Sequence, residues 1–202
     1  QLRIAGDGEI LVKGPCVTRS YHENPEATAE AIDGEGWLHT GDVGEIDADG
    51  YVYIRDRKKD LIITASGKNI APQSVENTLK TAPCVSQVAV YGDRKPYLVA
   101  LITLDSAAVK AWAKEHGIAN DDVTEVYTDP HFRTYLDAGI ARANKQLASY
   151  ETVKYYEVLP EDFTVENDLL TPTLKIRRRR IYARYHDLYE SLYQPTKAEA
   201  AY

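Results

Sequence analysis

Apolar and polar residues alternate in short stretches of the first quarter of the chain, with the period of two that is typical of strands with one buried face. This pattern predicts strands over residues 8–13, 43–46 and 51–54. Asp47-Ala48-Asp49-Gly50 suits a hairpin loop between the last two, and Asn24-Pro25 opens a short helix over residues 26–32. Residues 1–56 are therefore predicted to be β-rich and too short to form a self-sufficient core.

Beyond residue 56 the pattern mixes strands with longer helical periods. Apolar and β-branched runs predict strands over residues 61–63, 86–91, 97–104 and 153–159. The polar turn at residues 92–96 makes the second and third of these an antiparallel pair. Apolar residues at intervals of three and four predict helices over residues 72–79, 105–117, 130–147 and 176–192.

These elements predict an α+β protein. Residues 1–56 are the β-rich tail of a larger N-terminal domain, and residues 57–202 are a small C-terminal domain in which helices flank a mixed sheet. Residues 194–202 are predicted to be a frayed tail.

Composition narrows the class of protein. The 202 residues are 44% hydrophobic, which suits a soluble globular protein with a packed core. The net charge of −7 opposes nucleic-acid binding, which only the four arginines at 177–180 favour. We expect those arginines to form ion pairs with carboxylates. The acids expected as partners are Glu151, Glu157, Asp187 and Glu190.

Cysteine usage and apolar runs indicate a compartment. Cys16 and Cys84 are the only cysteines, and no His/Cys cluster occurs, so neither a disulfide framework nor a metal site is predicted. A reducing, cytoplasmic compartment fits this usage. No apolar run approaches the roughly 20 residues needed to span a bilayer. Methionine is absent even from position 1, so we expect a fragment, a processed product or an engineered piece.

Residues 55–77 concentrate most of the candidate chemistry. Arg57, Lys58 and Lys59 stand beside acidic neighbours, a density that suits holding an anion or exchanging ion pairs during a movement. Ser66-Gly67 is a turn at which glycine allows another molecule to approach the backbone. Taken alone, however, such a charge run usually marks a solvated face.

Two further segments give this stretch a context. Gly36-Trp37-Leu38-His39-Thr40-Gly41-Asp42 lies upstream, and Thr171-Pro172-Thr173-Leu174-Lys175 lies downstream, before a basic helix. In this order the three segments resemble the late motifs of the adenylate-forming superfamily, whose members activate carboxylic acids with ATP. The wording of residues 55–77 is most similar to long-chain fatty-acid–CoA ligases, and the resemblance covers nearly the whole chain.

The resemblance implies a role for each candidate residue. Asp42 would bind both ribose hydroxyls of the nucleotide, and Arg57 would contact the same ribose. A loop aspartate that caps its own turn is the structural alternative for Asp42, and pairing with Asp56 or Asp60 is the alternative for Arg57. Lys59 falls at the hinge about which the small C-terminal domain, a mobile lid, swings between two catalytic poses.

The other candidate residues belong to the lid. The resemblance implies that Lys175 bridges the substrate carboxylate and the α-phosphate during adenylation. The structural alternative is that Lys175 is an ordinary lysine before a basic helix. Ser66 and Gly67 would line the channel through which coenzyme A enters. Relatives often carry a lysine on the strand before this turn, whereas this chain has Ile63, so no charged helper is supported there.

The resemblance also implies an activity and its limits. The full-length enzyme would use ATP, Mg²⁺ and coenzyme A as cosubstrates with a fatty acid, in the cytoplasm or in contact with a membrane surface. The chain lacks a phosphate-binding loop, so the fragment alone is expected to be inactive without the missing N-terminal domain. Two alternatives stay open: an enzyme of the same superfamily that activates aryl or amino acids, and a noncatalytic interaction module.

Overall fold

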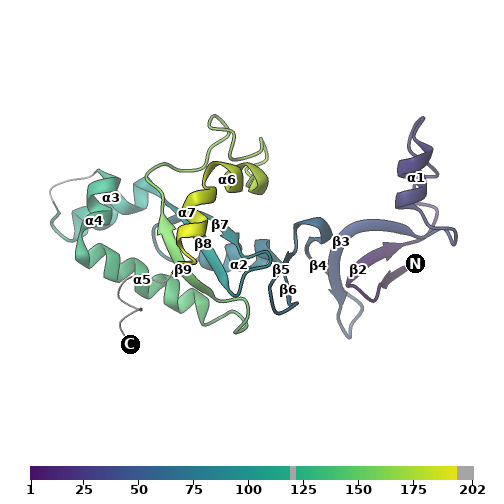
Figure 1. The fold of residues 1–202 in the computed structure, drawn as a ribbon, viewed down its shortest axis with the longest axis horizontal. Helices are drawn as coiled ribbons and strands as arrows, with labels where there is room; N and C mark the ends of the chain where they lie inside the picture. Colours follow the sequence, from purple (N-terminus) through teal and green to yellow (C-terminus); the bar gives the residue numbers. More distant parts are fainter. Residues whose placement is uncertain (119–121, 195–202) are drawn as a thin grey trace. The chain divides into compact units, whose positions relative to one another are not determined.

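The chain divides into two compact units in the computed structural model, unit 1 at Gln1–Leu61 and unit 2 at Ile62–Tyr202. The structure describes residues 1–118 and 122–194 (Figure 1). The tail predicted at 194–202 therefore lies outside the described residues, except for Gln194. The domain boundary predicted after residue 56 falls inside the last strand of unit 1.

Unit 1 is a four-stranded antiparallel sheet with one helix. Its elements in chain order are β1 (Leu2–Ile4), β2 (Glu9–Val12), α1 (Pro25–Ala31), β3 (Leu38–Ile46), β4 (Val52–Arg57) and the short 3₁₀ helix η1 (Lys58–Asp60). The strand order is β1-β2-β3-β4. The predicted strands, hairpin and helix of this region are confirmed, and the side chain of Asn24 caps α1 by accepting a bond from the Ala27 amide.

Strand β3 is longer than its apolar pattern predicts, because it begins at Leu38 and not at Val43. Polar residues and Gly41 conceal its first half, residues 38–42, which backbone pairing with β2 holds in place. The edge strand β1 was not predicted, since its three residues are too few for a recognisable alternation. Only Ile10, Leu11 and Trp37 are buried hydrophobic residues in unit 1, all of which is described, and this small core agrees with the expectation.

Unit 2 combines a three-stranded sheet with a small hairpin and six helices in its described part. Its elements are β5 (Ile62–Ile63), β6 (Asn69–Ile70), α2 (Pro72–Leu79), β7 (Val85–Tyr91), β8 (Leu98–Leu104), α3 (Ser106–Glu115), α4 (Val123–Thr128), α5 (Pro130–Asn144), β9 (Val153–Val158), α6 (Arg178–Arg184) and α7 (His186–Ser191).

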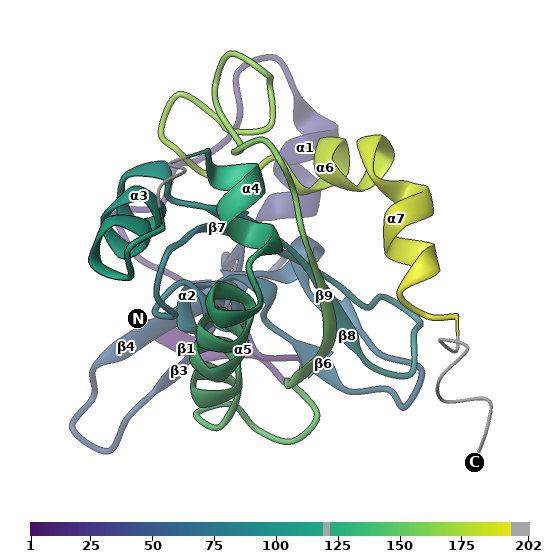
Figure 2. The same cartoon turned by 90° about the vertical axis from the view of Figure 1, so that its left-hand side faces the viewer.

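Strand β8 is the centre of unit 2, buried along its whole length. It pairs antiparallel with β7, as predicted, and parallel with β9, so the sheet is mixed. Leu98, Ala100 and Ile102 pack in one core with side chains of α2, α3 and α5. Val99 and Leu101 point to the other face, where they meet α6 and α7. Figure 2 shows these two groups of helices on opposite sides of the sheet, which confirms the α+β class with a flanked mixed sheet.

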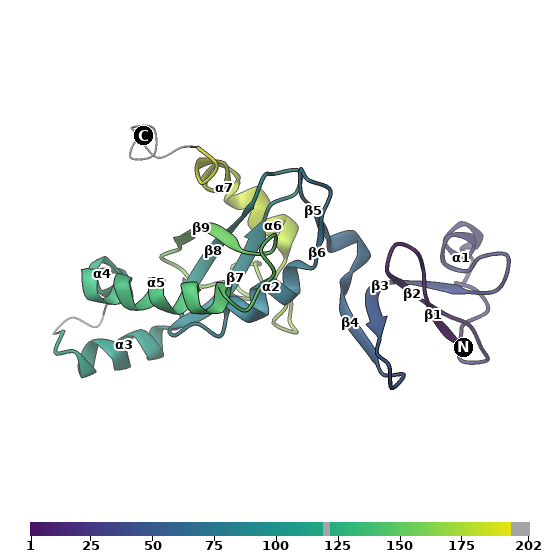
Figure 3. The same ribbon diagram turned by 90° about the horizontal axis from the view of Figure 1, so that it is seen from below.

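Aspartate caps start the helices on the first face. Asp105 accepts a bond from the Ala108 amide, and Asp129 accepts bonds from the amides of His131 and Phe132. Helix α4 was not predicted; it leads directly into α5 at Asp129, as Figure 3 shows. Helix α5 ends at Asn144, three residues before the predicted end, because the Asn144 side chain bonds both backbone groups of Val153 at the start of β9.

The single helix predicted at residues 176–192 is wrong. Ile176 forms a bridge with Leu170, and the helix that begins at Arg178 is interrupted at Tyr185, whose torsions are φ −117° and ψ 24°. The interruption lets Ile181 and Tyr189 both reach the buried face of the sheet. Across the described residues, no helix has the length and apolar character that crossing a membrane requires.

Gly139 in helix α5 allows a test of whether close packing outweighs helix propensity. Alanine usually stabilises a helix relative to glycine by roughly 1 kcal/mol. At Gly139, however, a Cβ atom would lie 2.4 Å from Cδ of the Pro83 ring, which cannot rotate away. We expect Gly139→Ala to lower the free energy of unfolding of unit 2 by about 1–3 kcal/mol, because overpacking outweighs propensity.

Urea unfolding measures this, with Trp112 of unit 2 as reporter and Trp37, the other tryptophan, replaced by Phe in every variant. The exposed neighbour Ala138→Gly is the control, and its expected loss of about 1 kcal/mol reports propensity alone. An increase in stability for Gly139→Ala would show that Pro83 yields to the added methyl group.

Candidate functional site

Asp42 and Arg57, two predicted site residues, are cross-strand partners in the β3–β4 hairpin. Nη1 of Arg57 lies 3.0 Å from Oδ1 of Asp42, and the same nitrogen donates to the carbonyl of Thr40 at 3.1 Å. The Arg57 guanidinium therefore forms an ion pair with Asp42, whereas Asp56, one of the partners considered from the sequence, accepts a bond from the Arg57 backbone amide at 2.7 Å. The hairpin register was the signal available for this pair.

The Asp42–Arg57 pair can be exchanged at little cost. The Arg57 side chain is 54% exposed and that of Asp42 is 29% exposed, so solvent screens the pair and it contributes about 0–1 kcal/mol to stability. A carboxylate can accept two hydroxyl bonds, and a guanidinium keeps several donors for a ligand. The arrangement therefore suits recognition of a ligand that carries neighbouring hydroxyl groups.

Glu9 fixes the β3 backbone next to this pair, a role that the sequence did not predict. Only 3% of Glu9 is exposed. Its carboxylate accepts a bond from the Gly41 amide at 2.8 Å and from Nζ of Lys58 at 2.9 Å, and lies 3.1 Å from Nδ1 of His39. Gly41 has a φ of +70°, which favours glycine, so Glu9 holds a point of β3 whose backbone few other residues could adopt. A glutamate at the head of an apolar strand was the only hint of this role.

The charges around Glu9 are mutually stabilised. Burial raises the pKa of Glu9, but the bonds from Lys58, His39 and Gly41 outweigh burial and leave that pKa below its usual value. Lys58 also lies 2.7 Å from Asp7, and its pKa is raised by Asp7 first and by Glu9 second. Both groups are therefore charged at neutral pH, and Lys58 is tied to the sheet.

An open cleft of about 780 Å³ lies within unit 1, beside Glu9 and Arg57. Its wall includes Glu9, His39, Gly41, Arg57, Lys58 and Lys59. Lys59 lies exposed in η1, two residues before the division between the units. The three cations in this lining, Arg57, Lys58 and Lys59, suit a polar, anionic ligand.

Ser66 and Gly67 lie at the tip of the β5–β6 hairpin in unit 2. The Gly67 amide donates to the Thr64 carbonyl at 2.9 Å, and Gly67 has a φ of +76°. A Cβ atom at Gly67 would meet nothing within 4 Å, so the turn geometry, not lack of space, calls for glycine. The tip is exposed and free of a covering side chain at that position.

Lys175 closes a tight turn before α6. The Thr171 amide donates to the Lys175 carbonyl at 2.8 Å, the Lys175 amide donates to Oγ1 of Thr171 at 3.1 Å, and Leu174 has a φ of +59°. The Lys175 side chain is exposed, so the backbone of the turn sets its place. Asp42, Arg57 and Lys59 thus belong to unit 1, whereas Ser66, Gly67 and Lys175 belong to unit 2.

Three of the four arginines at 177–180 form ion pairs, but with acids other than those expected. Arg177 lies 2.9 Å from Asp168, Arg180 pairs with the same carboxylate, and Arg178 pairs with Glu76. Glu190, one of the expected partners, pairs with Lys95 at 2.6 Å. Asp168 lies in the loop before α6, and Glu76 lies in α2. Because the helix begins at Arg178 and not at Ile176, the arginines face these acids and not the expected ones.

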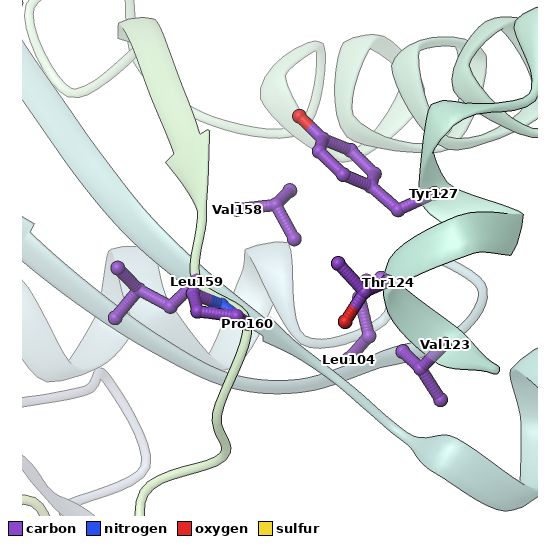
Figure 4. A pocket seen from close by; sticks show the side chains of 7 residues that line it. All are labelled: Leu104, Val123, Thr124, Tyr127, Val158, Leu159 and Pro160. Atoms are coloured by element: carbon purple, nitrogen blue, oxygen red, sulfur yellow. The ribbon is translucent and has the colours of Figure 1, made fainter.

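A separate hollow of about 220 Å³ lies in unit 2, between α4 and the ends of β8 and β9 (Figure 4). The residues that line it are Leu104, Val123, Thr124, Tyr127, Val158, Leu159 and Pro160. None is charged and none is a candidate site residue. Within residues 1–118 and 122–194, no group of three or more His, Cys, Asp or Glu could hold a metal ion.

Known proteins resemble this chain over most of its length. It is 40% identical over 193 residues to the long-chain-fatty-acid–CoA ligase FadD15 of Mycobacterium tuberculosis, covering 95% of this chain and 32% of that protein. It is 36% identical over 191 residues to the human long-chain-fatty-acid–CoA ligase 6, covering 93% of this chain and 27% of the relative. The chain therefore spans about a third or less of the length of these relatives.

A solved structure shares the fold. The A-PCP didomain of the carboxylic acid reductase from Segniliparus rugosus, in complex with AMP, superposes with a TM-score of 0.70 at 28% identity, over 92% of this chain and 24% of that one. Residues 59–197 match the family described as the AMP-binding enzyme C-terminal domain. The resemblance in the sequence motifs is thus confirmed, and the chain belongs to the AMP-binding enzyme C-terminal domain family.

Proposed function

We propose that this chain is the C-terminal part of an ATP-dependent long-chain fatty-acid–CoA ligase. The observation that carries the proposal is the cross-strand pair of Asp42 and Arg57, because Arg57 lines a polar cleft and the buried Glu9 bonds the Gly41 amide next to Asp42. Relatives at 40% and 36% identity bear the name of this activity, which supports the choice of substrate class. Unit 1 would be the end of the large domain, and unit 2 would be the mobile lid.

The whole protein would carry out two half-reactions. In the first, a fatty-acid carboxylate attacks the α-phosphate of ATP, presented with Mg²⁺, to give an acyl-adenylate and pyrophosphate. In the second, the thiol of coenzyme A attacks the acyl carbon and releases AMP. ATP, Mg²⁺, coenzyme A and the fatty acid are substrates in this proposal, and the phosphate-binding loop would come from the upstream part of the protein. A cytoplasmic location, with contact at a membrane surface, is part of the proposal.

Unit 1 would recognise the nucleoside. The Asp42 carboxylate would accept bonds from both ribose hydroxyls, while Arg57 would turn one of its N–H groups toward the same sugar. Because the pair is partly exposed, the ligand replaces a weak ion pair and some water. Glu9 would keep the backbone at Gly41 in place during this exchange, since the carboxylate that accepts the Gly41 amide bond is buried.

Unit 2 would supply a group to each half-reaction. The ammonium of Lys175 would offset the negative charge that gathers between carboxylate and α-phosphate in the transition state of adenylation. The exposed turn at Ser66 and Gly67 would line the path of the thiol arm in the second half-reaction. Ile63, on the strand before that turn, offers no charge to this path. Lys59 would be the hinge, which requires torsional freedom and not a particular side chain.

A second candidate is an adenylating enzyme that hands its acyl group to another acceptor. The likeness to a carboxylic acid reductase didomain favours this alternative at the level of the first half-reaction. The higher identity to named CoA ligases favours coenzyme A. Supplying the full-length protein with acyl-adenylate and coenzyme A distinguishes the two, because only the ligase releases acyl-CoA.

The proposed function makes a direct prediction about the parts and the whole. With ATP, Mg²⁺, palmitate and coenzyme A, the full-length protein should release AMP and palmitoyl-CoA. The 202-residue chain alone should release no pyrophosphate, because the phosphate-binding loop lies outside it. Pyrophosphate release by the isolated chain would contradict this, as would a full-length protein that adenylates no fatty acid.

A substitution at Lys175 tests its assignment to the first half-reaction. In the full-length protein, Lys175→Ala should slow adenylation by ~10²–10³-fold, as expected when one electrostatic donor to the transition state is lost. Thioester formation from supplied acyl-adenylate should change little. Lys154→Ala, which removes an exposed lysine from β9, is the control and should affect neither step. Equal losses in both half-reactions would make Lys175 a structural residue.

Substitutions at Lys59 separate a hinge from a charge. Lys59→Pro fixes φ near −65° and removes an N–H donor, so it should trap the lid and abolish one half-reaction more than the other. Lys59→Ala keeps the torsional freedom and should be mild. The two half-reaction rates of both variants decide the matter. A severe loss for alanine, with proline no more selective, would refute the hinge.

A further inference from the structure

Glu76, on α2, is a charged side chain in the core of unit 2. Only 4% of it is exposed. Its carboxylate accepts a bond from the Val90 amide of β7 at 2.9 Å and pairs with both terminal nitrogens of Arg178, with Nη2 at 3.0 Å from Oε2. A buried carboxylate with these partners is tightly held, because losing either partner leaves a charge without hydration.

Arg178 links this buried charge to the Lys175 turn. It is the first residue of α6 and follows Lys175 by three positions. Its guanidinium presents a planar fork that matches the two oxygens of Glu76, whereas a lysine would offer a point charge. The pair spans 102 residues of sequence, so it joins two distant segments of the chain.

The backbone between Lys175 and Arg178 is short and well bonded. Leu170 and Ile176 form an antiparallel bridge, and the Arg177 amide donates to the Leu169 carbonyl at 2.8 Å. Lys175 therefore stands on a narrow turn, and the two residues that follow it lead directly to Arg178 of the Glu76–Arg178 pair. Because the Lys175 side chain is exposed, this base is what limits where its ammonium group can reach.

We propose that Glu76 and Arg178 form a positioning pair for Lys175: the buried ion pair anchors the base of the turn, so that the ammonium of Lys175 meets the reacting groups in a reproducible place. The inference rests on the proposed role of Lys175. Arg178 acts through the turn and touches no substrate, since Glu76 occupies its fork. The same pair also ties the Lys175 turn to α2, which begins five residues after Gly67.

The test uses Arg178→Gln in the full-length protein, with Arg184→Gln as matched control. Arg184 lies on the same helix, but its pair with Glu161 is exposed and 3.7 Å long. We expect Arg178→Gln to lower kcat of adenylation by ~10²-fold, because misplacing a catalytic group by about 1 Å has this effect. The KM for ATP and thioester formation from supplied acyl-adenylate should change little. Arg184→Gln should leave both half-reactions unchanged.

A double-mutant cycle separates positioning from general damage. If Arg178 acts through Lys175, then Arg178→Gln should cause no further loss in the Lys175→Ala background. Losses that multiply would overturn the inference, and so would equal losses in both half-reactions. If Arg178→Gln does not fold, Arg178→Lys takes its place in the cycle. It keeps the charge but not the fork, and an intermediate adenylation rate is expected.

The outcomes also separate this inference from the proposed function. If Lys175→Ala leaves adenylation intact, the proposed role of Lys175 fails and the positioning role fails with it. If Lys175→Ala stops adenylation while Arg178→Gln behaves like Arg184→Gln, only the positioning role is overturned. Glu76→Gln is a second probe of the pair, and it should reproduce the selective loss of adenylation, since it removes the charge from the other side.

Discussion

A buried carboxylate must be matched by donors, and each unit of this protein is organised around one. Glu9 satisfies the requirement with Gly41, His39 and Lys58, and Glu76 satisfies it with Val90 and Arg178. Leaving such a charge unpaired is far more costly than forming the pair is favourable. The segments that supply the donors are therefore fixed: Gly41 precedes Asp42 in β3 of unit 1, and Arg178 follows Lys175 by three residues at the start of α6 in unit 2.

The groups proposed to meet substrates show the opposite physical character. Asp42, Arg57 and Lys175 are partly or fully exposed, and the one ion pair between them is screened by solvent. A weak pair can be replaced by a ligand without a large loss, whereas a buried pair cannot. Buried ion pairs that fix the backbone, together with exposed side chains that a ligand can displace, give a site that is pre-organised in its backbone and adaptable in its side chains.

The sequence predicted what depends on local pattern. Apolar periodicity located β7, β8, β9 and most of α5, and Asp105 and Asp129 marked helix starts through their own side chains. It could not reveal the pairing of Glu76 with Arg178, because no local pattern connects residues 102 positions apart. The interruption at Tyr185 was hidden for a similar reason: the chain bends to bury Ile181 and Tyr189 against a sheet that the helical pattern does not describe. The roles of Asp42, Arg57, Lys59, Ser66, Gly67 and Lys175 came from resemblance and stay predictions.

When the base of a turn is anchored and its lysine stays exposed, the entropy cost of ordering the lysine is divided between folding and binding. Ordering a backbone residue costs about 1–2 kcal/mol, and ordering a long side chain costs up to about 2 kcal/mol more. The Leu170–Ile176 bridge and the Glu76–Arg178 pair offset the entropy cost of ordering the backbone when the protein folds. Only the entropy cost of ordering the lysine side chain remains when the protein binds its substrate. A lysine held this way can be placed accurately when it is needed and released easily afterwards, which suits the role proposed for Lys175 in one of two successive half-reactions.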